Sequence, residues 1–169
     1  MIDIFSNKTL QPINLPIQQL LESLPAGEAR RVKVPSLTAP VQAAFLYGHK
    51  VSAGFPSPAD DYVEDRLDLN QLLIHNKTAT FFLRVKGDSM INAGIHDGDI
   101  IVVDRSITPI DRSVVVAVID SELTVKRLVL NNGVAELHAE NPGYAPIRFK
   151  KGQEVTIWGV VTSSVHTVK

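Results

Sequence analysis

The fold is decided by residues 114–130, which read VVVAVIDSELTVKRLVL. Two apolar runs rich in β-branched residues, Val114–Ile119 and Leu123–Leu130, lie on either side of the polar pair Asp120-Ser121. Apolar runs of this length, separated by a short polar turn, are typical of consecutive strands. This stretch therefore predicts two strands joined by a tight connection.

Similar runs occur on both sides of this stretch, bounded by turn signals rich in Gly, Asn and Asp. They are Thr80–Val85, Asp99–Val103, Val134–Ala139 and Val155–Val161. One short helix is expected over Asp68–Asn76, with Asp68 as N-cap, Gln71 three residues later, and Leu69, Leu72 and Leu73 as its apolar face. The strand runs are too continuously apolar for a sheet with one face in water. We therefore expect a mainly β domain of short, folded-over sheets or a partial barrel.

The chain changes character near residue 54. Five of its ten prolines, Pro12, Pro16, Pro25, Pro35 and Pro40, fall in the first forty residues. Because proline removes a backbone donor and disfavours helix in the residue before it, no long helix is expected there, only about two turns over residues 15–24. Residues 36–54 are interpreted as an extended arm. The predicted organisation is an N-terminal arm, residues 1–53, and a compact β-rich domain, residues 54–169.

The composition excludes several classes of protein. The 169 residues include no cysteine, which rules out disulfides, thiolate metal sites and cysteine catalysis. No apolar run approaches the ~18 residues that a membrane helix needs, and the N-terminus lacks the order of a secretory signal. We therefore expect a cytoplasmic protein. The net charge of -1 argues against a polycation that coats nucleic acid, so direct DNA binding is not expected.

A candidate nucleophile, Ser89, lies in Gly87-Asp88-Ser89-Met90, directly after the run Thr80–Val85. A serine at a strand end beside a glycine can project its hydroxyl out of the sheet, and nearby backbone N–H groups can line an oxyanion site. Turns also use serine simply to bond their own backbone. Taken alone, Ser89 fits either role.

A serine nucleophile needs a base, and the sequence offers Lys126. Strand alternation places Lys126 on the same face as Thr124, Leu128 and Leu130. A desolvated lysine has a lowered pKa and can accept a proton, whereas a lysine whose stem lies along the surface keeps its charge. The five histidines show neither metal-ligand spacing nor obvious pairing, so we expect no metal or cofactor and have no strong candidate for a Ser-His-Asp triad. They are His49, His75, His96, His138 and His166.

Several segments together resemble the LexA/UmuD family of self-cleaving Ser/Lys peptidases, most closely its UmuD-like members. The matching segments are residues 51–64, 68–74, 87–90, 94–99, 123–126 and 158–161. They occur in the family's order, cover about residues 51–161, and keep the family's separation between serine and lysine. The N-terminal arm, residues 1–53, is longer than the arm of UmuD-like proteins, and residues 1–40 contain no motif that we recognise.

The resemblance implies a LexA-like peptidase domain in which Ser89 is the nucleophile and Lys126 the general base. The backbone N–H groups of Ser89 and Asp88 would hold the oxyanion. The severed bond would be Ala53-Gly54, since the family cuts a small residue followed by glycine. Two other Ala-Gly pairs, at residues 26–27 and 93–94, lack the flanking pattern or lie too near the nucleophile. Both cis and trans cleavage are possible for a chain of this reach.

The resemblance also implies partners. Cleavage in the family is stimulated by a RecA filament on single-stranded DNA during the SOS response. The shortened form, as a homodimer, would act with a Y-family DNA polymerase (UmuC-like) in translesion synthesis. Three alternatives remain open at this point. One is a LexA-like transcriptional repressor inactivated by the same cleavage, and another is a catalytically silent β-scaffold. The third is a signal peptidase, for which no membrane anchor is expected.

Overall fold

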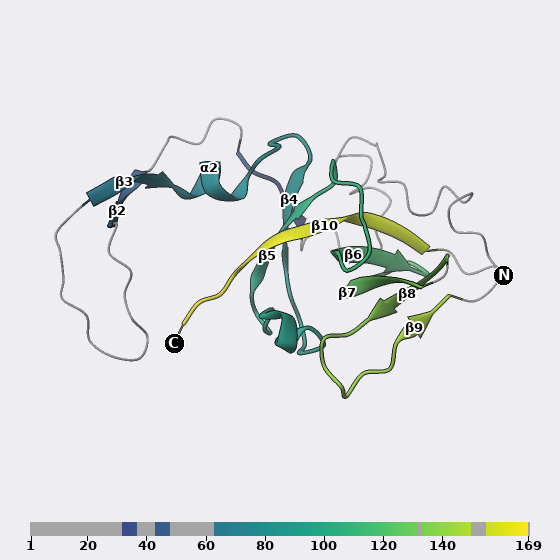
Figure 1. The fold of residues 1–169 in the computed structure, drawn as a ribbon. Helices are drawn as coiled ribbons and strands as arrows, with labels where there is room; N and C mark the ends of the chain where they lie inside the picture. Colours follow the sequence, from purple (N-terminus) through teal and green to yellow (C-terminus); the bar gives the residue numbers. More distant parts are fainter. Residues whose placement is uncertain (1–31, 37–42, 48–62, 132, 150–154, 169) are drawn as a thin grey trace. The chain divides into compact units, whose positions relative to one another are not determined.

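The structure, a computed structural model, describes residues 32–36, 43–47, 63–131, 133–149 and 155–168. The chain divides into two compact units, one formed by residues 36–75 and the other by residues 1–35 and 76–169. No helix in the described segments is long and apolar enough to cross a membrane. Each unit is described separately below, with its elements labelled as in Figure 1.

The larger unit is built on one antiparallel sheet of eight strands, in the order β1-β4-β5-β10-β6-β7-β8-β9. Its strands are β1 (Val32–Lys33), β4 (Thr80–Arg84), β5 (Ile100–Asp104), β6 (Val114–Ile119), β7 (Glu122–Asn131), β8 (Val134–His138), β9 (Ile147–Arg148) and β10 (Val155–Val165). The six strands predicted from the sequence are all confirmed, with ends that shift by a few residues at most. Strands β1 and β9 carry too few residues to give a local signal.

The hairpin that decides the fold forms as expected. Ile119 on β6 pairs with Glu122 on β7, which leaves Asp120 and Ser121 as a two-residue turn. Both turn residues have positive φ, 48° and 71°. Positive φ at both central positions defines a type I′ turn, whose twist matches that of the flanking strands. The local chemistry of the quoted stretch therefore sets the register of β6 against β7.

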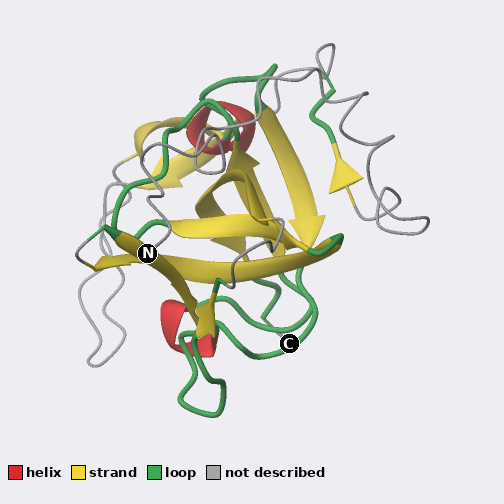
Figure 2. Ribbon diagram, turned by 90° about the vertical axis from the view of Figure 1, so that its right-hand side faces the viewer, coloured by secondary structure: helices red, strands yellow, loops and turns green. Residues whose placement is uncertain are grey.

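The long strand β10 folds the sheet over. Its first half, Val155–Val160, pairs with β6, and its second half, Val160–Val165, pairs with β5. The register shifts once in each half, so the strand bends as it passes between its two partners. Figure 2 shows the strands crossing one another rather than lying in a single plane. The predicted folded-over, mainly β architecture is confirmed.

Gly159 lies at the bend of β10. A Cβ atom at this position would lie 2.8 Å from Val103 Cγ1 and 2.9 Å from the Asp104 carbonyl oxygen. Neither distance is possible for a real Cβ, so only glycine allows β10 to approach β5 this closely. Beside it, Trp158 packs edge-to-face against Phe81, with ring centroids 5.8 Å apart.

Two apolar clusters fill the fold. The first includes Phe81, Met90, Ile101, Val116 and Trp158, and it supports the segment between β4 and β5. The second is built mainly from β6, β7, β8 and β10, and its members are Val115, Ala117, Leu128, Ala135, Leu137, Ile157 and Val160. Because β6 contributes to both clusters with alternate residues, its two faces are both buried.

The smaller unit contains the hairpin of β2 (Ala43–Tyr47) and β3 (Val63–Asp68), followed by the short helix α2 (Leu69–Leu73). Asp68 caps the helix, as predicted, by accepting a hydrogen bond from Asn70 N at 2.8 Å. The predicted apolar face is wrong, because Leu69 and Leu72 are 59% and 51% exposed. A helix of only five residues has no second turn with which to build a buried stripe.

Two predictions about the N-terminal arm have different outcomes. The extended backbone expected for residues 36–54 holds in β2, which also pairs with β3. The turns expected over residues 15–24 lie outside the described residues, as does the Ala53-Gly54 bond. The division at residue 54 stays a prediction. The segment Val32–Lys33, upstream of that point, pairs with Leu83 and Phe82 of β4 in the main sheet.

Candidate active site

Ser89 is held by the loop that leaves β4. Gly87 has a φ of 94°, which few other residues adopt, so the chain can turn sharply two residues before the serine. The Gly87 backbone N–H donates to Asp97 Oδ1 at 2.6 Å, which ties the loop to the turn before β5. Met90, only 2% exposed, anchors the following residue in the core. Ser89 itself is half-buried, with a fixed backbone on both sides.

Lys126 reaches Ser89 from β7. Its Nζ lies 2.8 Å from Ser89 Oγ, 3.1 Å from Thr124 Oγ1 and 3.0 Å from the Val125 carbonyl oxygen. The lysine is only 8% exposed, so of the two possibilities that the sequence left open, the desolvated amine is the one observed. Among the described residues, no carboxylate forms an ion pair with Lys126. The buried amine therefore has oxygen neighbours but no opposite charge.

Burial lowers the pKa of the Lys126 ammonium below its ordinary value. Taking a charge out of water favours the neutral form, and no nearby anion offsets the effect. A neutral amine has two N–H donors and one lone pair. The three oxygens match this set if Thr124 and Val125 accept the two N–H bonds and the lone pair receives the Ser89 hydroxyl proton. The contact geometry thus suits proton transfer from serine to lysine.

A cavity of about 460 Å³ opens beside this pair. Its walls combine apolar side chains with the loop that carries the serine. The lining residues are Leu83, Arg84, Val85, Lys86, Gly87, Asp88, Ser89, Met90, Ile101, Val116, Leu123, Thr124, Val125, Lys126 and Tyr144. The cavity is large enough for a few residues of an extended peptide, and none of the described residues that line it is a histidine. The described residues therefore form no Ser-His-Asp triad there.

The predicted oxyanion groups also lie at this cavity. Asp88 and Ser89 both line it. Within the described part of the chain, the backbone N–H of neither residue has a hydrogen-bond acceptor. Two adjacent unbonded donors next to a serine hydroxyl are what an oxyanion site requires. The geometry is compatible with that role.

Tyr144 and Asn141 contact the loop that carries the serine, and no sequence signal indicates either side chain. Tyr144 OH donates to Asp88 Oδ1 at 2.5 Å, and Asn141 Nδ2 donates to the Asp88 carbonyl oxygen at 3.1 Å. The hydrogen bond to the Asp88 carboxylate raises the pKa of Tyr144. Contacts across more than fifty residues leave no local signal in the sequence.

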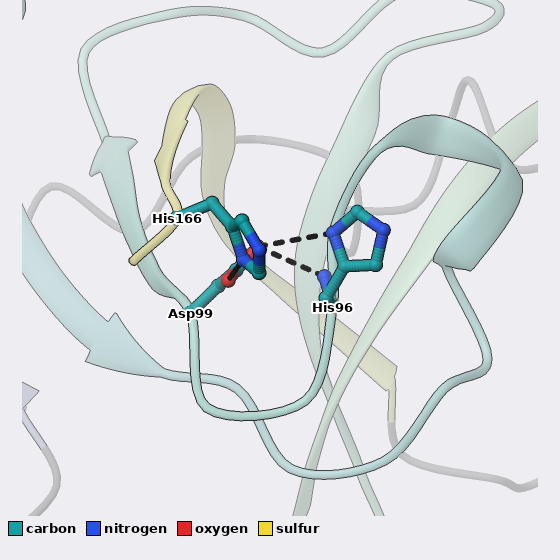
Figure 3. A group of neighbouring side chains, drawn as sticks. All are labelled: His96, Asp99 and His166. Carbon is teal, nitrogen blue, oxygen red and sulfur yellow. Dashed lines mark hydrogen bonds and ion pairs between the residues drawn. The ribbon is translucent and has the colours of Figure 1, made fainter. Parts of the chain in front are cut away.

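The described histidines have different surroundings. His138 contacts Glu136 at 2.8 Å, and His75 is exposed. The rings of His96 and His166 have centroids 4.8 Å apart, and both side chains lie beside Asp99 (Figure 3). Both are surface histidines, as expected, but their proximity was not indicated by their spacing, because the pairing of β5 with β10 brings them together. His49 lies outside the described residues.

The fold and this site together define a class. A folded-over antiparallel sheet presents a serine on a glycine turn to a buried lysine, beside a peptide-sized cavity. The chain belongs to the Peptidase S24-like family, whose model matches residues 45–162. This confirms the family indicated by the sequence.

Three relatives refine that placement. The chain is 45% identical over 131 residues to Protein SamA of Salmonella typhimurium, which covers 77% of this chain and 91% of SamA. It is 46% identical over 122 residues to Protein MucA of Escherichia coli, covering 71% and 82% of the two chains. It is 45% identical over 112 residues to LexA repressor 2 of Geobacter sulfurreducens, covering 66% and 54%. The chain is a UmuD-like member of the LexA/UmuD family.

Proposed function

We propose that this protein is a self-cleaving serine peptidase of the SOS response, with Ser89 as nucleophile and Lys126 as general base. The observation that supports it most directly is the 2.8 Å contact between Lys126 Nζ and Ser89 Oγ. The contact matters because burial lowers the pKa of this lysine and no described carboxylate restores it. A serine hydroxyl is a weak nucleophile until an adjacent base removes its proton.

The proposed substrate bond is Ala53-Gly54, in the segment that connects β2 to β3. Ser89 Oγ attacks the Ala53 carbonyl carbon while its proton passes to Lys126 Nζ. The backbone N–H groups of Asp88 and Ser89 stabilise the oxyanion. When the C–N bond breaks, Lys126 returns the proton to the Gly54 amine. Water then hydrolyses the Ser89 ester, which releases the Ala53 carboxylate and restores the serine.

The biological setting follows from the family. We propose that a RecA filament on single-stranded DNA stimulates the cut, and that residues 54–169, as a homodimer in the cytoplasm, act with a Y-family polymerase in translesion synthesis. The similarity to SamA and MucA, which this chain covers by 91% and 82%, supports a protein of the UmuD type.

The experiment is incubation of the purified full chain in mildly alkaline buffer without added protease, followed by mass spectrometry. The expected products are residues 1–53 and 54–169. Ser89→Ala and Lys126→Ala should each lower the rate by at least about 1,000-fold, because each removes one half of the reacting pair. Ser113→Ala, away from the cavity, is the matched control and should still cut. Different termini would reject the assigned bond, and full cleavage by Ser89→Ala would reject the nucleophile.

A second candidate function is a transcriptional repressor inactivated by the same cut. The similarity to LexA repressor 2 favours it, but this chain covers only 54% of that protein. DNA binding by the intact chain and co-purification by the cut chain distinguish the two functions. A sequence-specific operator shift by the intact chain supports the repressor, whereas co-purification of the cut chain with a polymerase, without such a shift, supports the first proposal.

A further inference from the structure

A second cluster of chemically active side chains lies where Ile100 of β5 pairs with Val165 of β10. Val165 of β10 pairs with Ile100 of β5, so the next residues outward, His166 and Asp99, meet at the end of the ladder. His96, in the turn before β5, completes the group (Figure 3). His166 follows Asp99 by 67 residues, which is why no spacing in the sequence indicates the cluster.

Asp99 is the buried centre of this group, with a side chain only 1% exposed. Its Oδ1 lies 2.5 Å from His166 Nδ1. Its Oδ2 accepts hydrogen bonds from the His96 backbone N–H and from Ser164 Oγ, both at 2.9 Å. Burial alone would raise the pKa of Asp99, but these hydrogen bonds and the nearby imidazole outweigh it and lower the pKa. Together, the two carboxylate oxygens contact a backbone N–H, a hydroxyl and an imidazole.

His96 Nδ1 is the atom that the hydrogen-bond network does not explain. It is buried from water, and within the described part of the chain it has no hydrogen-bond partner. It lies 3.7 Å from Asp99 Oδ2, too far for a hydrogen bond, and that oxygen already accepts two others. A buried imidazole nitrogen that lies beside a carboxylate and a second imidazole, without a hydrogen bond to either, is in the position of a ligand atom without its ligand.

We propose that His96 Nδ1, His166 Nδ1 and the Asp99 carboxylate bind one divalent transition-metal cation of the zinc type. Two imidazole nitrogens and one carboxylate oxygen form a donor set that suits Zn²⁺, whereas Mg²⁺ and Ca²⁺ prefer oxygen ligands alone. Three protein ligands leave a fourth position for water. This site is separate from the Ser89 cavity, whose wall contains none of the three residues.

The required rearrangement is small. The three candidate donor atoms lie within 4.8 Å of one another. Around a tetrahedral Zn²⁺ with bonds of about 2.0–2.1 Å, ligand atoms are separated by about 3.3 Å. The cation would replace the contact between His166 and Asp99 and draw in the more distant donors. The His96 and His166 side chains are 42% and 48% exposed, so rotation of the rings can provide this movement.

The location gives the cation a structural consequence. Gly98 N, in the same turn as His96, donates to the Val85 carbonyl oxygen at 3.0 Å, and Val85 N donates to the Asp99 carbonyl oxygen at 2.8 Å. The bound ion would therefore fasten the end of β10 to the turn that supports the segment before Ser89. Binding itself does not depend on the proposed peptidase activity.

The test is a Zn²⁺ titration of the full chain against a chromophoric chelator, with the bound metal counted after dialysis. All three donors lie downstream of residue 54, so a self-cut sample keeps the site on one fragment. We expect one Zn²⁺ per chain. His96→Ala and His166→Ala should each weaken binding by at least about tenfold, since each removes one of three ligands. Bound Co²⁺ should give the visible absorption of a tetrahedral site, lost in both variants.

His138→Ala is the matched control, because His138 also contacts a carboxylate, Glu136, but has no second histidine beside it. This variant should bind Zn²⁺ as the unmodified chain does. Equal weakening by His138→Ala would mean that the metal binds surface histidines at large, and the proposal would fail. A three-ligand site, with an affinity on the order of micromolar or tighter, should be filled at 100 µM Zn²⁺. If the unmodified chain binds no Zn²⁺ at that concentration, the proposal fails and the cluster is only a hydrogen-bonded contact.

Discussion

Lys126 and Asp99 are two ionisable side chains with similar burial and opposite surroundings. They are 8% and 3% exposed as residues. Asp99 accepts from a backbone N–H and a hydroxyl and contacts an imidazole, so its charge is compensated and its pKa is lowered. Lys126 has only neutral oxygens around it, and its pKa is lowered because the charge is not compensated. Burial alone does not decide whether a group is structural or reactive, because the charged and hydrogen-bonding partners around the group determine its pKa.

The largest expected effect on stability comes from removing Asp99, the carboxylate whose charge is compensated. Asp99→Ala leaves the His96 N–H, Ser164 and His166 without their common acceptor. We expect the free energy of unfolding to fall by about 3 kcal/mol, because several buried partners lose a charged hydrogen-bond acceptor at once. Urea denaturation measures this as a lower midpoint. Glu122→Ala, at an exposed strand end, should change stability by less than about 0.5 kcal/mol. A loss below about 1 kcal/mol for Asp99→Ala would show that the partners are solvated instead.

The pH dependence of self-cleavage tests whether Lys126, the amine without an opposite charge, acts as the general base. Only neutral Lys126 accepts the Ser89 proton, so the first-order rate should rise about tenfold per pH unit and level off once the pH passes the lysine pKa. That plateau should begin below pH 10.5, the ordinary lysine value. Rates measured by mass spectrometry from pH 6 to 10 check this, with Ser89→Ala as the blank. A rate that does not change with pH would exclude Lys126 as the base.

The lowered pKa of Lys126 also determines whether the free energy of unfolding rises or falls with pH. Between the lowered pKa of folded Lys126 and the ordinary value of 10.5, the unfolded chain binds more protons than the folded one. The contribution of this lysine to the free energy of unfolding therefore increases with pH across that window. Below the window the full cost of burying the ammonium is present.

The smallest effect is expected from replacing the lysine with an apolar residue of similar length. Lys126→Met should raise the free energy of unfolding by about 1 kcal/mol relative to Ser89→Ala, since it removes a buried charge that has no opposite partner. Neither chain cuts itself, so thermal denaturation can compare them directly. Lys86→Met, on an exposed residue, should change stability little. Destabilisation by Lys126→Met would mean that the amine contributes net stability through its three oxygen contacts.

Much of the fold follows from local sequence. The six longer strands of the eight-stranded sheet are predicted because β-branched runs end in turns whose residues tolerate positive φ, as at Asp120 and Ser121. Strand β3 is not predicted, since Val63–Asp68 reads Val-Glu-Asp-Arg-Leu-Asp and its conformation depends on pairing with β2. The two-residue strand β1 likewise exists only through β4. Long-range pairing decides these segments, and no periodicity in the chain reports it.

The candidate site was predictable in part. Ser89 and Lys126 are indicated by a glycine turn after a strand and by a lysine on an apolar strand face, and the family motifs join them. Tyr144 and the pairing of His96 with His166 were not predicted. Each depends on which strand ends the folded-over sheet brings together, and the chemistry of a single tyrosine or histidine does not indicate its neighbour.

The pairing of strands upstream of residue 53 bears on what a broken peptide bond at Ala53-Gly54 accomplishes. Residues 32–33 are hydrogen-bonded to β4, and residues 43–47 are hydrogen-bonded to β3. A cut at Ala53-Gly54 would break neither the β1–β4 nor the β2–β3 hydrogen bonds. The severed peptide would stay attached as a non-covalent complex, and its departure would follow its own dissociation rate. The lifetime of that nicked complex, rather than the chemistry, would then set when the edge of β4 becomes free for another strand.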